Sequence, residues 1–584
     1  MTTMPDLPTI TLDTTLADLY RRGSPRNAKK RIAQVFSGIN SGTRLSADVP
    51  RNAKYLYQDA SFNTVPDDAS SSSSGLNGDD AEQQRRRQQQ QKELAVKHLS
   101  LIPQRDAFIS GDTAVVLFHL DDADSRQRAH DRREAERTMS VLPENQRPDL
   151  VFCPGPSRIP VKEAGIDLIA YKLVLDGIDA YDLVVPTDTH WFVNSKAALA
   201  RSGLPTPRST ILELDGVADE ARACCGPCAD TDTDTDTDAA AEEFVIPETC
   251  AGSRGAWFAR QSGRILAALE AHPLPFVLKN QQTFGGAGTY MVRTEEQRAG
   301  VVDDLRGGVL RKLLSSVTPS NRHLRPAALV LSDLVEDPVG DFGLTFFVTD
   351  DGGDPIFLAA SEQLTDGHNA WIGSTINYGR QHELERKFGP LVKRIASWLR
   401  SHDYVGPAGA DVLETRPKPA TNGHGTDGHG QNGCDSNGQK PNGHKTNGHK
   451  TNGHKTNGHH NTTQNGHTNG THPDNPDADF SNFHVVDLNI RTSGSLCLPL
   501  LRTHFTSRGL MSASSFSIGC AQGRDAFIAD FADDFAAGRM CVVSWYEDPD
   551  TGASLADVAV GAEDEAGLRR AMQRVRDATD TVTF

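Results

Sequence analysis

The segment that most constrains this chain is residues 275–290, PFVLKNQQTFGGAGTY. Three apolar residues lead into Lys279, and a polar run then opens into Gly285, Gly286 and Gly288. The pattern predicts a short strand followed by a loop whose backbone N–H groups can approach an anion, with the lysine supplying charge for a phosphate. On its own the segment fits a glycine-rich hairpin with a surface lysine better, so the phosphate interpretation needs support from elsewhere in the chain.

The overall charge and composition narrow the class of protein. The 584 residues include 60 Lys and Arg against 77 Asp and Glu, a net charge of −17 that disfavours binding to nucleic acid or to anionic membranes. The N-terminus lacks a signal-peptide pattern, and no apolar run approaches the roughly 18 residues of a membrane span. We therefore expect a cytoplasmic protein with no membrane or nucleic-acid partner.

The cysteines do not suggest a disulfide framework, because nine of them are spread over a long chain. Cys224, Cys225 and Cys228 cluster as CCGPC beside a DTDTDTD run. No second ligand pair follows at a spacing typical of zinc sites. We interpret the cluster as part of a disordered insert rather than a metal site.

Composition and periodicity predict the domain organisation. Residues 1–95 are predicted to be largely disordered, with a short helix as an alternative for 26–36. After residue 95, buried-strand patterns alternate with helical stretches, which indicates an α/β layer with a mainly parallel sheet. We predict an α/β domain over 96–190, a subdomain over 191–335 and a C-terminal subdomain over 336–584. Disordered inserts are expected at about 217–245 and, where NGHKT repeats, at 415–479.

A second lysine occurs in residues 194–207, NSKAALARSGLPTP, a helical pattern that starts at a candidate Asn194 cap and ends at Gly203. Lys196 falls in the first turn, where the helix dipole disfavours a positive charge. The position suggests an anion nearby, although an ordinary surface lysine explains this stretch equally well when it is considered alone.

Two further segments predict a strand pair with polar side chains. Residues 406–414, GPAGADVLE, and 483–495, FHVVDLNIRTSGS, form a hairpin once the NGHKT insert is set aside. Asp487, Asn489 and Arg491 are two apart, so we expect them on one face of a strand with apolar flanks. Carboxylate and amide oxygens suit Mg²⁺, and a guanidinium suits a phosphate or carboxylate.

These four stretches, with residues 329–347 between them, resemble in their order the ATP-grasp superfamily of carboxylate–amine ligases over about 190–510. The long inserts resemble those of fungal solid-state culture-specific ATP-grasp proteins. The resemblance implies an α/β (α+β) fold in which an N-terminal parallel domain precedes two α+β subdomains that clamp ATP. One departure is that Asp487 stands where the family commonly has glutamate. The acid at the position of the family's adenine hinge, Asp333, is also an aspartate.

The resemblance also implies roles for single residues. Lys196 and Lys279 correspond to the phosphate-binding lysines, and the three loop glycines to a mobile lid over the triphosphate. The remaining assignments are Asp333 and Leu334 at the adenine hinge, Asp341 (or Glu336) at the ribose, Asp411, Asp487 and Asn489 as metal ligands, and Arg491 with Lys279 as catalytic residues.

The implied reaction is the activation of a carboxylate by Mg-ATP as an acyl-phosphate, which an amine then attacks as ADP and phosphate leave. Mn²⁺ is an alternative metal, the partners are small-molecule substrates, and a homodimer is an open alternative. A phosphotransferase on the same fold and a non-catalytic nucleotide-binding scaffold are the competing interpretations. No Ser-His-Asp or Cys-His pattern supports a covalent hydrolase.

Overall fold

The computed structural model describes part of the chain. The described segments are residues 7–36, 52–58, 103–119, 125–216, 224–228, 246–283, 288–365, 371–417, 480–548 and 552–579 without 553. The centre of the NGHKT insert and two loop glycines, Gly285 and Gly286, therefore lie outside the described residues.

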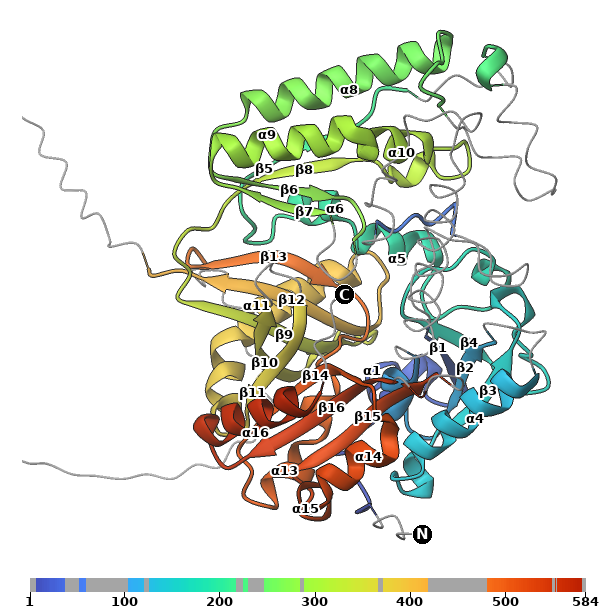
Figure 1. The fold of residues 1–584 in the computed structure, drawn as a ribbon, viewed down its shortest axis with the longest axis vertical. Helices are drawn as coiled ribbons and strands as arrows, with labels where there is room; N and C mark the ends of the chain where they lie inside the picture. Colours follow the sequence, from blue (N-terminus) through green and yellow to red (C-terminus); the bar gives the residue numbers. More distant parts are fainter. Residues whose placement is uncertain are drawn as a thin grey trace, which may run out of the picture. The chain divides into compact units, whose positions relative to one another are not determined.

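The N-terminal layer is a four-stranded parallel sheet in the order β3-β2-β1-β4 (Figure 1). Its strands are β1 (Ile32–Val35), β2 (Ala114–Phe118), β3 (Asp149–Cys153) and β4 (Leu168–Tyr171). The predicted parallel α/β layer is therefore confirmed. Its interior strand β1, however, comes from a region that the sequence predicted to be disordered or helical.

Residues 7–36 correct the prediction of a largely disordered N-terminus. Helix α1 (Leu16–Gly23) starts with a capping box, in which Thr15 and Asp18 each accept a hydrogen bond from the other's backbone N–H. Leu16 and Leu19 are fully buried in the main core. At Gly23 a Cβ atom would lie 2.5 Å from the Phe347 ring, so the helix packs against strand β9 (Gly340–Val348) at a position that only glycine allows.

A second sheet is antiparallel, in the order β5-β8-β6-β7. It contains β5 (Ser209–Leu212), β6 (Phe276–Asn280), β7 (Thr289–Val292) and β8 (Leu329–Asp333). Helices pack on one face, as Figure 1 shows, with bounds α8 (Ser253–Ala271), α9 (Glu295–Asp304), the π-helical turn η5 (Leu305–Val309) and α10 (Leu310–Ser315). Leu278, Leu331, Ile265 and Leu313 are among the buried residues that join sheet and helices.

The third sheet has eight antiparallel strands in the order β13-β12-β9-β10-β11-β14-β16-β15. The strands are β9 (Gly340–Val348), β10 (Ile356–Thr365), β11 (Trp371–Asn377), β12 (Gly406–Glu414), β13 (Phe483–Asn489), β14 (Ser512–Cys520), β15 (Met540–Glu547) and β16 (Ser554–Ala562). The predicted pairing of residues 406–414 with 483–495 across the insert is confirmed as the β12–β13 pair, although β13 ends at Asn489.

The remaining helices cover the sheets or connect them. They are α4 (Ser125–Met139), α5 (Thr187–Val193), α6 (Lys196–Arg201), α11 (Gln381–Arg400), α12 (Cys497–Leu500), α13 (Arg502–Thr506), α14 (Gly523–Asp530), α15 (Ala532–Ala536) and α16 (Glu565–Ala578). Short 3₁₀ turns lie at η1 (Pro25–Asn27), η2 (Glu144–Gln146), η3 (Pro156–Arg158), η4 (Ile178–Ala180), η6 (Arg322–Leu324) and η7 (Tyr378–Arg380).

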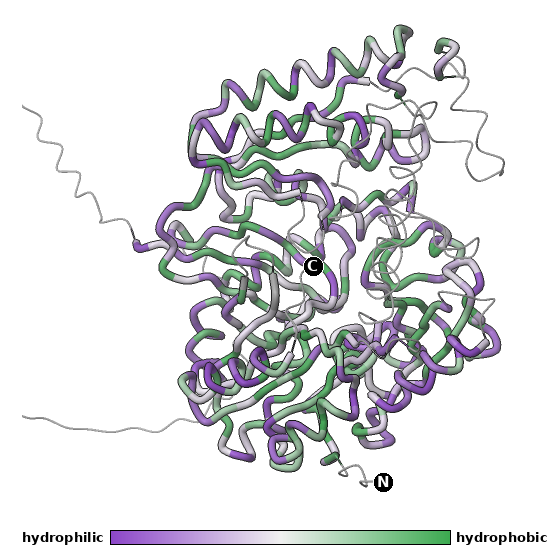
Figure 2. The backbone as a smooth tube through the Cα atoms, viewed as in Figure 1, coloured by the Kyte–Doolittle hydropathy of each residue, from purple (hydrophilic) through white to green (hydrophobic). Residues whose placement is uncertain are grey.

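The hydrophobic cores follow this arrangement of sheets. The largest core joins α1 and the parallel sheet to β9, β12 and helix α11 of the eight-stranded sheet. Figure 2 shows the strands as mainly hydrophobic and helix α4 as mainly hydrophilic, in keeping with its charged sequence. Among the described residues no helix is both long and apolar enough to cross a bilayer. The α/β (α+β) fold class is confirmed, whereas the boundaries at 190 and 335 stay predictions.

Truncation of a core residue on α1 tests whether this N-terminal segment is folded. Leu16 is buried and Arg22 exposed on the same helix. Leu16→Ala should therefore lower the free energy of unfolding by about 2–5 kcal/mol, whereas Arg22→Ala should change it by less than about 0.5 kcal/mol. Urea denaturation followed by circular dichroism measures both, and equal stabilities would mean that α1 is not part of the core.

Candidate active site

The centre of the candidate site is the β12–β13 pair. Asp411 on β12 lies directly opposite Asp487 on β13, and Gly409 lies opposite Asn489. Directly opposed residues of an antiparallel pair have their side chains on the same face, so two carboxylates and an amide gather there. Like charges placed in this way repel each other, and the arrangement therefore needs compensating cations.

Lys196 supplies one of these cations. Helix α6 begins at this residue, and the side chain of Ser195, not of the predicted Asn194, caps it by accepting the N–H of Ala198. The side chain of Lys196 is only 8% exposed, and its Nζ forms an ion pair with Asp487 Oδ1. The Lys196 N–H donates to the carbonyl of Gln281, which joins the helix start to the polar run after β6.

Lys279, at the end of β6, supplies the second cation. A β-bulge interrupts the pairing of β12 with β13. Asp411 pairs with Asp487 and the next residue, Val412, pairs with Val485, so Val486 is left out of the register. Lys279 Nζ donates a hydrogen bond of 2.6 Å to the carbonyl oxygen of Val486. The irregularity in β13 therefore gives this lysine a backbone acceptor beside Asp487.

Asp411 is held by two amides, one of which the sequence did not identify. Its Oδ2 accepts from Asn489 Nδ2 at 3.1 Å, and its Oδ1 accepts from Gln363 Nε2 at 3.0 Å. Gln363 reaches Asp411 from β10 across β9, where a Cβ atom at Gly343 would lie 2.3 Å from Gln363 Nε2. The glycine thus makes room for the amide.

Arg491 lies just beyond the end of β13, although the sequence placed it on the strand. Its Nη2 donates to Asn489 Oδ1 at 2.9 Å, which continues the chain of contacts from Asp411. Asn194 accepts the backbone N–H of Ile490 at 3.0 Å and lies 3.5 Å from Arg491 Nη1. The predicted helix cap therefore fixes the segment that carries the arginine.

The charges of the cluster shift its pKa values in opposite directions. Burial, together with neighbouring Asp487 and Asp341, raises the pKa of Asp411 to about 7. Burial opposes ionisation of Asp487 as well, but Lys196 and Lys279 outweigh it and hold the pKa of Asp487 below its usual range. Burial also lowers the pKa of Lys279 to about 8, with Lys196 contributing. Asp487 is therefore the more readily ionised carboxylate of the pair.

The other predicted site residues that the structure describes lie outside this network of hydrogen bonds and ion pairs. Asp333 ends β8 and pairs with the exposed Arg208 at 3.1 Å, and Leu334 follows it. Asp341 is exposed on β9, opposite Leu413 and therefore on the same face of the sheet as Asp411. Gly288 has φ of +69°, and its carbonyl accepts the N–H of Asn280 at 3.0 Å.

A small pocket of about 20 Å³, with room for about one water molecule, borders the cluster at Arg491. Its walls come from α1, β1, β4, α5 and the segment before β12, and they include Tyr20, Gln34, Tyr171, Lys172, His190, Tyr404, Arg491 and Thr492. Within the described part of the chain, three of its buried atoms have no hydrogen-bond partner: Gln34 Nε2, His190 Nε2 and Thr492 Oγ1. Buried polar atoms without partners cost free energy, so the pocket is suited to a polar ligand.

The hydrogen atoms of His190 can be assigned. The N–H of Ile490 donates to Asn194 Oδ1, so the Nδ2 of the same amide is the donor that lies 3.2 Å from His190 Nδ1. Burial and the charge of Arg491 lower the pKa of His190 to about 3, so the ring is neutral. Nδ1 therefore accepts, and Nε2 carries a proton that faces the pocket lining without a partner among the described residues.

Comparisons with known proteins find similarity to solved structures. No family model and no curated sequence matches the chain. The ADP complex of an N5-carboxyaminoimidazole ribonucleotide synthetase matches 99% of this chain and 98% of its own, with 9% identity and a TM-score of 0.41. An Aspergillus clavatus carboxyaminoimidazole ribonucleotide synthase complexed with ATP matches 80% and 91%, with 8% identity and a TM-score of 0.38.

An L-amino acid ligase from Bacillus licheniformis matches 80% of this chain and 92% of its own, with 9% identity and a TM-score of 0.38. These three structures are of a synthetase in complex with ADP, a synthase in complex with ATP, and a ligase. TM-scores of about 0.4 and identities near 10% carry no argument for this chain. The chemistry of this chain has to be inferred from its own side chains.

The neutral His190 predicts a pH dependence of stability. Its pKa is lowered from 6.5 to about 3 in the folded protein, so below pH 6.5 the unfolded chain binds a proton that the native state does not. Stability is therefore complete above pH 6.5 and falls toward pH 3, by about 1.4 kcal/mol per pH unit from this group.

His190→Asn retains an acceptor for Asn194 and removes the titration. Urea denaturation at about pH 7.5 and 5.5 should show that the wild-type protein loses about 1.4 kcal/mol more than the variant over this interval. Equal losses in the two proteins would contradict the assignment of a neutral, buried imidazole.

Proposed function

We propose that this protein is an ATP-dependent ligase that activates a carboxylate and joins it to an amine, with release of ADP and phosphate. The observation that carries the proposal is the cluster of opposed Asp411 and Asp487 with Lys196 and Lys279 bound beside them. Two lysines, two carboxylates and the nearby Arg491 are the groups that a reaction on a nucleoside triphosphate requires. Because one fold can host many functions, this arrangement of charged side chains is a stronger argument for the function than the fold is.

The residues also fit a divalent cation. Asp411, Asp487 and Asn489 offer the hard oxygen atoms that Mg²⁺ prefers, and Mn²⁺ accepts the same ligands. Burial, together with the neighbouring Asp487 and Asp341, raises the pKa of Asp411, and a divalent cation beside this carboxylate would favour its ionised form. When bound, the metal would supply charge neutralisation on the phosphates. The chain's contribution would be to keep the three oxygen ligands on one face of β12 and β13.

The two lysines would bind the phosphates. Lys196 is paired with Asp487 and Lys279 with the carbonyl of Val486, so each could exchange its present acceptor for a phosphate oxygen. A carboxylate oxygen of the substrate would attack the γ-phosphorus, and the bond between that phosphorus and the ADP oxygen would break. The amine would then attack the acyl carbon, phosphate would leave, and the amine would lose a proton. The lysines and Arg491 would stabilise the charge that develops during these steps.

The small pocket beside Arg491 has room for a single polar group, and we propose it as the position of one oxygen of the substrate carboxylate. Its unpartnered donors include His190 Nε2–H, Gln34 Nε2 and the Thr492 hydroxyl, all of which can donate to an anionic oxygen. Buried Lys172 also lines the pocket, but its charge is balanced by an ion pair with Asp106 at 2.6 Å. These donors favour a small anionic or carbonyl-bearing substrate over an apolar one.

ADP release by the full-length protein tests the proposed ligase. Mg-ATP is supplied with pooled small carboxylates, with pooled amines, or with both, and release should require both pools. Release with an alcohol or phosphate acceptor and no amine would indicate a phosphotransferase instead. ATP-induced thermal stabilisation without release under all conditions would indicate a nucleotide-binding scaffold.

Substitutions at the proposed phosphate and metal contacts should abolish this turnover. Lys279→Ala and Asp487→Asn each remove a charge from the cluster, and we expect kcat/KM to fall by at least about 100-fold. The asparagine keeps an oxygen near Lys196, which limits the destabilisation that alanine would cause by leaving a buried charge unpaired.

Lys393→Ala is the matched control, because Lys393 is exposed and pairs with exposed Asp354. It should retain wild-type turnover. Circular dichroism and thermal melts establish that the variants are folded, and wild-type rates in either site variant would refute the assignment.

The support of Asp411 by Gln363 gives a further prediction. An alanine at Gly343 must displace Gln363, because the added Cβ would lie 2.3 Å from its Nε2. Loss of such an outer contact to a metal ligand typically costs about 10–100-fold in metal affinity. Gly343→Ala should therefore raise the Mg²⁺ concentration that half-saturates turnover by this factor. Gly389→Ala, with no atom within 4 Å of its added Cβ, should not.

A further inference from the structure

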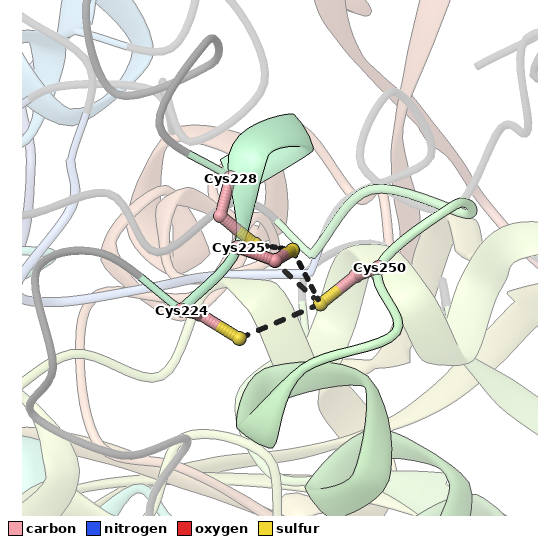
Figure 3. A group of neighbouring side chains, drawn as sticks. All are labelled: Cys224, Cys225, Cys228 and Cys250. Carbon is pink, nitrogen blue, oxygen red and sulfur yellow. Dashed lines mark hydrogen bonds between the residues drawn. The ribbon is translucent and has the colours of Figure 1, made fainter.

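Four cysteines from two segments of the chain that connects β5 to α8 lie close together (Figure 3). The Sγ–Sγ distances are 3.7 Å for Cys224–Cys250, 3.6 Å for Cys225–Cys228, 3.7 Å for Cys225–Cys250 and 3.5 Å for Cys228–Cys250. All four sulfur atoms lie within 4.8 Å of one another. In a tetrahedral zinc site with Zn–S bonds of about 2.3 Å, neighbouring sulfurs are about 3.8 Å apart.

The start of α8 points backbone donors at two of these sulfurs. The N–H of Arg254 donates to Cys224 Sγ and the N–H of Gly255 to Cys250 Sγ, both at 3.2 Å. The Ser253 hydroxyl donates to Cys224 Sγ at 3.4 Å. The first N–H groups of a helix have no partner within the helix, so the sulfurs take the place of a side-chain cap. Such donors stabilise the thiolate form that binds metals.

Two glycines leave space for the cysteines. A Cβ atom at Gly252 would lie 2.3 Å from Cys224 Sγ, and one at Gly255 would lie 2.0 Å from the carbonyl oxygen of Cys250. Any other residue at either position would push the sulfurs apart. The convergence therefore depends on the residues around the cysteines as well as on the cysteines themselves.

We propose that Cys224, Cys225, Cys228 and Cys250 bind one Zn²⁺ ion as a closed tetrathiolate site that fastens residues 224–228 to the start of α8. A site with four protein ligands leaves no position for water or substrate, so the role is structural. This corrects the sequence interpretation, in which the CCGPC cluster lacked further ligands. The remaining ligand, Cys250, follows the acidic DTDTDTD run.

Disulfides are the competing chemistry of the same sulfurs. A disulfide brings two sulfurs to about 2.05 Å and uses them in pairs. Here Cys250 lies at nearly the same distance from each of the other three, which suits a shared central ion. Whether the four cysteines bind zinc or form disulfides does not depend on the proposed ligase activity.

Metal analysis of the full-length protein tests the proposal. The protein is purified without an affinity metal and dialysed against a chelator weak enough to remove zinc only from histidines, because the NGHKT repeats are a second place for metal. Mass spectrometry of the metal should find one zinc per chain. Cys228→Ser and Cys250→Ser should each reduce this content at least tenfold, and Cys520→Ala, at a buried cysteine elsewhere, should leave it unchanged.

Two measurements on the wild-type chain keep the test independent of how the variants fold. Replacement of zinc by Co²⁺ should give the thiolate-to-cobalt charge-transfer band and the intense visible bands of tetrahedral sulfur ligation, which histidine ligands do not give. Zinc removal by a strong chelator should expose four additional thiols to a thiol reagent and lower Tm by several degrees. Absence of zinc and of the cobalt band, or recovery of these cysteines as disulfides, would overturn the proposal.

Discussion

The candidate site depends on the repulsion between two carboxylates on neighbouring strands. Asp411 and Asp487 face each other across β12 and β13, and this pair would be unfavourable without nearby cations. The cations come from elements outside the eight-stranded sheet, Lys196 from the start of α6 and Lys279 from the end of β6. The same electrostatic requirement therefore draws together the four-stranded antiparallel sheet, the α6 helix and the edge of the largest sheet.

Sequence patterns alone select candidate site residues that lie within one short segment. Lys279 follows an apolar strand, and Asp487 and Asn489 share the alternation of β13, so local periodicity identified them. Gln363 and Gly343 were not identified, because their importance comes from a side chain that crosses a neighbouring strand to reach Asp411. A single sequence carries no signal for such a cross-strand contact.

The fold class was predictable for similar reasons, and the N-terminus was not. The alternation of strands and helices between residues 113 and 185 predicted the parallel sheet. Strand β1 has only four residues, preceded by a basic run, and its stability comes from pairing with β2 and β4 on its two sides. Tertiary pairing thus outweighs weak local propensity. Cys250 was overlooked in a comparable way, since an acidic run separates it from the CCGPC cluster.

The position of the NGHKT insert has a consequence for how the chain tolerates change. The insert connects β12 to β13, and the N–H of Thr415, its first residue, donates to the carbonyl of Asn482 at 2.8 Å, which closes the hairpin at the edge of the insert. Asp411 and Asp487 lie farther along the same ladder, inside this closure. The entropy of closing a loop grows only with the logarithm of its length, about 0.6 kcal/mol for each doubling. Related chains could therefore lengthen or shorten this segment greatly while the register of the two carboxylates stays the same.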